Sequence, residues 1–96
     1  MGAIFNAVKF ETSDKKEVQA QWNEMTSKSL LEDGYSYSGE IGMLAGEISW
    51  KDVKKSSAEL AEEYVEEHHD KWEFALAASF KDGQTKGWVV GGWCSS

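Results

Sequence analysis

The spacing of the apolar residues changes along this chain, and that change constrains the fold more than any other feature of the sequence. From Gly2 to Glu11 the side chains divide between two faces with a period of two, which is typical of a strand: one face has Ile4, Asn6, Val8 and Phe10, and the other has Phe5, Ala7, Lys9 and Glu11. Residues 14–32 then carry apolar side chains at intervals of three and four, which predicts an amphipathic helix. Asp14 is the expected N-cap of this helix, and Gly34 is expected to end it.

The second half of the chain adds a glycine-rich segment, another amphipathic helix and a hairpin. The glycines of the middle segment favour two short strands separated by a turn. Asp82 and Gly83 form a hairpin turn signal between two segments of alternating pattern. The elements predicted here are strands at 36–42 and 47–50, a polar connector at 51–57, a helix at 57–71, and strands at 74–81 and 85–94.

Together these elements give the order β-α-β-β-α-β-β. Two amphipathic helices and a mostly antiparallel sheet predict the α+β class, arranged as a two-layer sandwich, with a ferredoxin-like variant as the leading topology. With 96 residues and no proline or low-complexity tract, the chain is expected to form a single domain over residues 1–96. This length excludes a two-domain enzyme.

The composition bears on three questions: whether the protein binds DNA, in which redox compartment it resides, and whether it spans a membrane. All ten basic residues are Lys, so a surface that binds duplex DNA is not expected, because that work relies on Arg as well as Lys. A single cysteine, Cys94, cannot form an intramolecular disulfide and is expected to be a partly buried structural thiol in a reducing cytoplasm. No stretch of about 18 apolar residues is present, so no membrane span is predicted.

Most of the net charge lies in one short segment. Seven acidic residues and one Lys between Glu59 and Glu73 carry −6 of the chain's net charge of −7. Projected on a helix, six of the acids share the face opposite the apolar residues. They are Glu59, Glu62, Glu63, Glu66, Glu67 and Asp70. This face is a candidate surface for a basic partner, and the alternative is that it only keeps the protein in solution.

No constellation of residues predicts catalysis, a metal or a cofactor. His68 and His69 adjoin the acids, but His68 falls in the middle of the apolar arc, so the ligand-type side chains point apart. Only His69, at the edge of that arc, could join the acidic stripe. Serines are frequent, yet none sits in a Gly-x-Ser-x-Gly elbow. We therefore expect a protein that is not an enzyme.

Two glycine-rich and aromatic segments are candidates for a ligand pocket. Glycines let a backbone approach a ligand, aromatic rings supply stacking faces, and backbone N–H groups can meet phosphate. The candidate residues are Tyr35, Tyr37, Gly39, Gly42, Lys86, Trp88, Gly91, Gly92 and Trp93. For the first segment, the alternative is a bulged edge strand whose tyrosines pack in the core.

The five tryptophans also bear on assembly. A core this small cannot bury all five deeply, so some aromatic surface should be exposed. An exposed aromatic patch marks a ligand pocket or a subunit interface. We therefore expect homo-oligomers.

Three motifs resemble a recurring pattern in small uncharacterised proteins of phages and their bacterial hosts. They are Tyr37-Ser-Gly-Glu-Ile-Gly, His68-x-x-Lys-Trp-x-x-Ala-Leu-Ala and Gly91-Gly-Trp-Cys-Ser, which span about the last two thirds of the chain. Small acidic phage proteins of this size are often inhibitors of host defence. They act as DNA mimics, as plugs on an effector, or as sponges that sequester a cyclic nucleotide signal.

Two functions follow as hypotheses. The first is a non-enzymatic binding protein, in its sharpest form a phage anti-defence sponge in the host cytoplasm that sequesters a cyclic nucleotide immune signal. The second is an inhibitor of another protein, or a DNA-mimic-like module, that acts through the acidic face of the helix at 57–71. The lack of Arg counts against the first, because planar phosphate clamps favour Arg.

Overall fold

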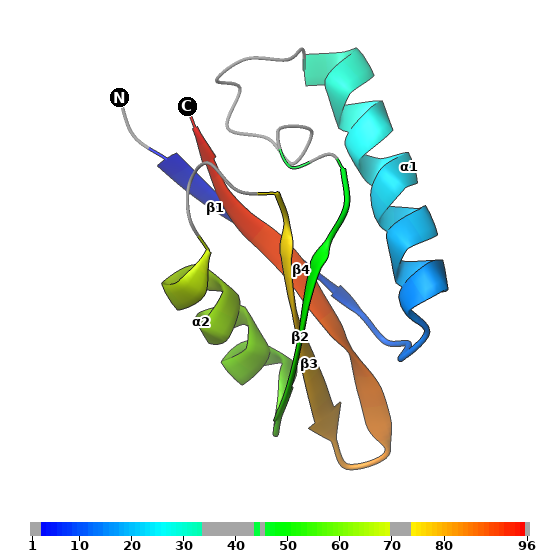
Figure 1. The fold of residues 1–96 in the computed structure, drawn as a ribbon, viewed down its shortest axis with the longest axis vertical. Helices are drawn as coiled ribbons and strands as arrows, with labels where there is room; N and C mark the ends of the chain where they lie inside the picture. Colours follow the sequence, from blue (N-terminus) through cyan, green and yellow to red (C-terminus); the bar gives the residue numbers. More distant parts are fainter. Residues whose placement is uncertain (1–2, 34–43, 45, 70–73, 96) are drawn as a thin grey trace.

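The computed structural model describes residues 3–33, 44, 46–69 and 74–95. Two helices and four strands make up this part of the chain (Figure 1). In chain order they are β1 (Ala3–Phe10), α1 (Lys15–Asp33), β2 (Ser49–Lys55), α2 (Ala58–His68), β3 (Leu76–Asp82) and β4 (Thr85–Ser95). The predicted strand at 36–42 lies outside the described residues.

The four strands form one mixed sheet in the order β1-β4-β3-β2. The β1–β4 and β4–β3 pairs are antiparallel, whereas β3–β2 is parallel. The parallel pair is joined through α2, because two parallel neighbours need a crossover rather than a tight turn. The predicted α+β class, the two helices and the mostly antiparallel sheet are thus confirmed.

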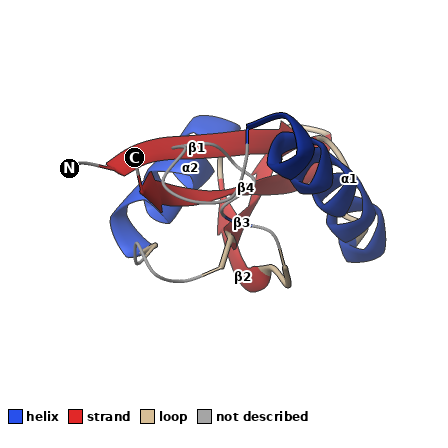
Figure 2. Ribbon diagram, turned by 90° about the horizontal axis from the view of Figure 1, so that it is seen from above, coloured by secondary structure: helices blue, strands red, loops and turns tan. Residues whose placement is uncertain are grey.

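The two helices pack on opposite faces of the sheet, as Figure 2 shows. On one face Val18 and Trp22 of α1 join a buried cluster with Ala77 and Val90, and on the other Val65 of α2 packs into a second cluster. The layers are therefore helix, sheet and helix, in place of the expected two layers and the ferredoxin-like arrangement. The physical reason is that β3 and β4 carry apolar side chains at both parities, so each face needs cover.

Strand β2 corrects the sequence prediction. Residues 51–57 were expected to be a polar connector, but the strand runs from Ser49 to Lys55. Its polar residues are compatible with a strand because β2 lies at the edge of the sheet and most of its side chains face solvent. An edge strand of this kind lacks the apolar alternation by which strands are recognised.

Helix α2 is shorter than predicted. As a result His68, which was expected on the apolar side, is exposed, and His69 is buried instead. Ser57 caps the helix, its hydroxyl accepting a hydrogen bond from the backbone N–H of Leu60 at 3.2 Å. The last helical residue is His68, which is exposed and stacks on Tyr64 at 4.0 Å between ring centroids. His69 is the buried one, at 7% exposure, because it follows the helix and no longer obeys the helical period.

His69 bridges two backbone segments that strand pairing does not join. Its Nδ1 accepts a hydrogen bond from the backbone N–H of Trp93 at 3.0 Å, and its Nε2 lies 2.8 Å from the carbonyl oxygen of Phe74. Because an N–H donor faces Nδ1 and a carbonyl faces Nε2, we assign the neutral tautomer with its proton on Nε2. The ring also fills the space above Gly92, where a Cβ atom would overlap it.

Candidate ligand-binding site

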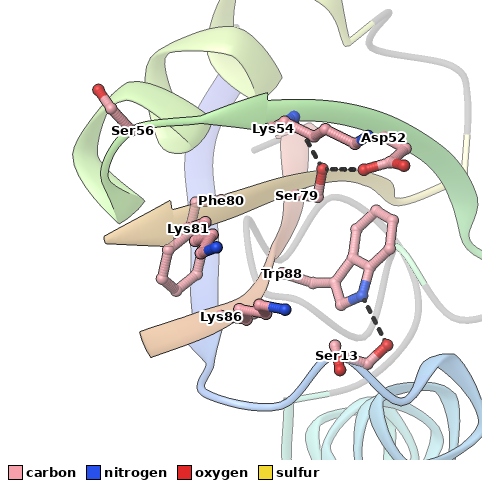
Figure 3. Close-up of a pocket in the computed structure, with 10 residues that line it drawn as sticks. Ser13, Asp52, Lys54, Ser56, Ser79, Phe80, Lys81, Lys86 and Trp88 are labelled. Atoms are coloured by element: carbon pink, nitrogen blue, oxygen red, sulfur yellow. Dashed lines mark hydrogen bonds between the residues drawn. The ribbon is translucent and has the colours of Figure 1, made fainter. Parts of the chain in front are cut away.

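A cavity opens on the α1 face of the sheet, near the β3–β4 hairpin. Figure 1 shows that the hairpin extends beyond the start of α1, so the helix does not cover this end of the sheet. The cavity has a volume of about 640 Å³, within the range of small-molecule sites. Its lining comes from the α1 entrance and from β2, β3 and β4 (Figure 3), and consists of Ser13, Asp52, Lys54, Ser56, Ser79, Phe80, Lys81, Lys86, Gly87 and Trp88.

Two of the lysines form a cross-strand pair of like charge. Lys81 of β3 is directly opposite Lys86 of β4, so both side chains leave the same face of the sheet. Like charges at directly opposite positions destabilise a sheet. Neither ammonium group, nor that of Lys54, lies within ion-pair distance of a carboxylate in the described residues. This unneutralised charge would be relieved by an anion in the cavity.

The β2 side of the cavity is built on an irregularity of the strand. The β2–β3 register shifts between Lys51 and Lys55, and Lys54 has a positive φ of 51°. Its backbone N–H donates to the Ser79 hydroxyl at 2.9 Å, and that hydroxyl donates to the Asp52 carboxylate at 2.6 Å. A left-handed conformation is costly for a non-glycine residue and persists where the surroundings impose it. Here Ser79 fixes the bulge that brings Lys54 to the cavity.

Two tryptophans, Trp88 and Trp50, pack on the α1 face at this end of the sheet. Trp88 is 5% exposed and contributes the floor of the cavity, while its Nε1–H donates to the Ser13 carbonyl at 3.3 Å. Trp50 packs edge-on against it with ring centroids 5.0 Å apart. The Lys15 ammonium lies 5.7 Å from the Trp50 ring and 5.5 Å from the Trp88 ring, in cation–π range. Lys15 thus packs against both indole rings, although it is not one of the residues that line the cavity.

The fold separates the two signs of charge. The lining of the cavity holds three lysines and one acid, although the whole chain has a net charge of −7. The glutamates of the acidic helix face project from α2, on the other side of the sheet, and all five are exposed. Asp70 lies outside the described residues. An anionic ligand in the cavity would therefore be separated by the sheet from the acidic face.

The candidate residues of β4 do not gather in one place. Lys86 and Trp88 line the cavity, whereas Gly91, Gly92 and Trp93 lie further along the strand. A Cβ atom on Gly91 would meet the β1 backbone, and one on Gly92 would meet the ring of His69, so both glycines serve close packing between protein groups.

Trp93 is partly buried against the other face of the sheet. Its ring lies 5.3 Å from that of Phe5, and its Nε1–H donates to the Glu66 carbonyl of α2 at 2.9 Å. The remaining ligand candidates, Tyr35, Tyr37, Gly39 and Gly42, lie outside the described residues, and their role stays a prediction.

Sequence reasoning missed most of the cavity. The hairpin signal at 82–83 and the period of two suffice to place Ser79, Lys81, Lys86 and Trp88 on one face, so this part of the site was present in the sequence. The turn itself is formed by Gly83 and Gln84, between the paired residues Asp82 and Thr85. Lys54 and Asp52 carried no such signal, because the polar segment 51–57 lacks the apolar alternation by which strands are recognised.

Comparison with protein-family models, with curated proteins and with solved structures finds no match for this chain. Within the described ranges, no three His, Cys, Asp or Glu side chains converge on a point where they could hold a metal ion. Neither described helix has the apolar length that would cross a membrane.

Proposed function

We propose that this protein binds an anionic small molecule of the nucleotide class in the cavity formed by β2, β3 and β4. The observation that carries the proposal is the cross-strand pair Lys81 and Lys86, joined by Lys54 around one cavity and without acidic partners in the described residues. A cluster of ammonium groups on an acidic protein recognises phosphate as a set of point charges, a role that Lys performs without Arg.

The apolar floor supports a ligand with a ring as well as a charge. Trp88 belongs to the lining with its ring on the α1 face, whereas the ring of Phe80 packs in the cluster under α2. A volume of about 640 Å³ is ample for a nucleotide. Ser56 and Ser79 add hydroxyl groups at the β2 side. The Ser79 hydroxyl already donates to Asp52 and accepts from Lys54, so we assign it to positioning the site and not to attack on the ligand.

In its narrowest form the proposal makes the protein a sponge that sequesters a cyclic nucleotide immune signal in a phage-infected cell. A sponge binds its ligand and releases it unchanged. Purified protein would be incubated with a panel of cyclic dinucleotides and cyclic mononucleotides, and the recovered ligand would be identified by mass spectrometry. Intact ligand supports the sponge, whereas a hydrolysed product would show an enzyme at the same site.

Binding is tested by thermal shift and calorimetry on the same panel, with inorganic phosphate as the simplest probe. The double variant Lys81→Gln/Lys86→Gln should weaken binding at least tenfold. It should also raise the unfolding free energy by about 0.2–1 kcal/mol, because a repulsive cross-strand pair is removed. The matched control is Lys28→Gln/Lys51→Gln, which removes two exposed lysines outside the cavity. The proposal fails if nothing in the panel binds, or if both double variants bind equally.

A second candidate function uses the acidic face of α2 as the surface that occupies a basic site on another protein. All five described glutamates of this face are exposed, and none is in an ion pair within the described residues. Replacement of Glu59, Glu62, Glu63 and Glu66 by Gln should abolish capture of a basic partner and leave ligand binding in the cavity unchanged. Capture that survives these substitutions would reject this function.

A further inference from the structure

The two edges of the sheet differ in how they meet solvent. At one edge, β2 is interrupted by its bulge and presents charged side chains, which are features that block pairing with another strand. At the other edge, β1 pairs with β4 in an unbroken register over all eight residues from Ala3 to Phe10. The outer side of β1 has no strand partner among the described residues.

The direction of the backbone groups on β1 follows from two glycines of β4. A Cβ atom on Gly91 would meet the carbonyl oxygen of Asn6, and one on Gly87 would meet that of Phe10, so these carbonyls point toward β4. In an antiparallel pair, alternate residues direct both backbone groups to the same side. The N–H and C=O groups of Phe5, Ala7 and Lys9 therefore point outward.

We propose that β1 pairs antiparallel with β1 of a second copy of this chain, about a two-fold axis at Ala7, to give one continuous sheet across the dimer. This register places Ala7 opposite Ala7 of the second copy and Phe5 opposite Lys9 of the second copy. All the outward groups then meet outward groups, which makes about six backbone hydrogen bonds. A register shifted by one residue would set outward groups against inward ones.

Charge complementarity favours a second copy as the occupant. Phe5 lies under the C-terminal half of α2, because its ring contacts Trp93, which donates to the Glu66 carbonyl. The opposing Lys9, an exposed cation whose ammonium lies 3.3 Å from the Glu11 carboxylate of its own chain, would thus enter beside the glutamates of the acidic face. On the other side of the strand, Ile4 is 49% exposed and would lie opposite Phe10 of the second copy. Pairing would cover this exposed side chain.

The register is tested by cross-linking under mild oxidation. In the proposed dimer the two Ala7 Cα atoms are about 5.5 Å apart, which a disulfide spans. The two Lys9 Cα atoms are about 14 Å apart, beyond that reach. Ala7→Cys should therefore give a covalent dimer on a non-reducing gel, whereas Lys9→Cys should not. Cys94 is 1% exposed and is present in both variants, so any cross-linking through Cys94 would be the same in the two. Equal cross-linking of both variants would overturn the proposal.

The assembly itself is tested by sedimentation over a range of concentrations. The chain should be a dimer at the higher concentrations, and Ala7→Pro should be a monomer that keeps its circular dichroism spectrum, since the lost N–H points away from β4. Lys9→Glu should raise the dissociation constant about tenfold by setting like charges together, while Lys28→Glu, with the same change of charge on α1, should not. If Ala7→Pro does not fold, the comparison of Lys9→Glu with Lys28→Glu decides whether the dimer forms through β1. A monomer at every concentration, or equal effects of both charge changes, would refute the dimer.

Discussion

Replacement of His69 by Ala tests the assignment of this buried ring as a backbone bridge. The substitution removes the acceptor of the Trp93 N–H and the donor to the Phe74 carbonyl, and no other protein partner for these two bonds is present in the described residues. Both bonds are partly buried, so each backbone group left unpaired costs up to about 1–3 kcal/mol, and water entering the vacated space recovers part of that cost. We therefore expect a loss of about 2–4 kcal/mol in the free energy of unfolding.

The adjacent histidine supplies a matched control. His68 is exposed, stacks on Tyr64 and is bonded through Nδ1 to the Tyr64 carbonyl at 2.9 Å. Because both groups are near solvent, His68→Ala should cost less than about 1 kcal/mol. His69→Gln should fall between the two alanine variants, since one amide can replace only part of the bridge.

The assay is urea unfolding followed by circular dichroism. A slope of about 2 kcal/mol per M converts the expected loss in His69→Ala into a midpoint shift of about 1–2 M. Amide exchange of Trp93 should accelerate in the same variant, because its N–H loses its acceptor. Free energies of unfolding of the two alanine variants that agree within about 0.5 kcal/mol would refute the reasoning.

Three further outcomes follow from the packing and the backbone. Trp22→Ala should cost about 3–5 kcal/mol in thermal or urea unfolding, because the indole is fully buried and donates to the Leu44 carbonyl at 3.3 Å; a cost below 1 kcal/mol would contradict its place in the core. Gly92→Ala should lower stability by about 1–3 kcal/mol, since the added Cβ overlaps His69, and an unchanged melting temperature would argue against that contact. Lys54→Gly should raise the unfolding free energy by about 1 kcal/mol by relieving the left-handed conformation, while calorimetry should show weaker anion binding; tighter binding would remove Lys54 from the site.

Part of the site was accessible from the sequence, and part was not. The hairpin signal at 82–83 and the period of two are local features, and they suffice to place Lys81, Lys86 and Trp88 on one face. Lys54 joins them only because β2 pairs in parallel with β3 through a long crossover. Nothing within a few residues of Lys54 indicates that pairing, so local reasoning could not include it.

The sequence by itself determined the elements with strong periodicity. Strand β1, helix α1 with its buried stripe of Val18 and Trp22, and the β3–β4 hairpin all follow from the spacing of neighbouring side chains. The tertiary structure alone decided that the helices take opposite faces, that a polar segment is an edge strand, and that His69 is buried. These outcomes depend on contacts between residues far apart in the chain, where burial on both sides of one sheet outweighs local preference.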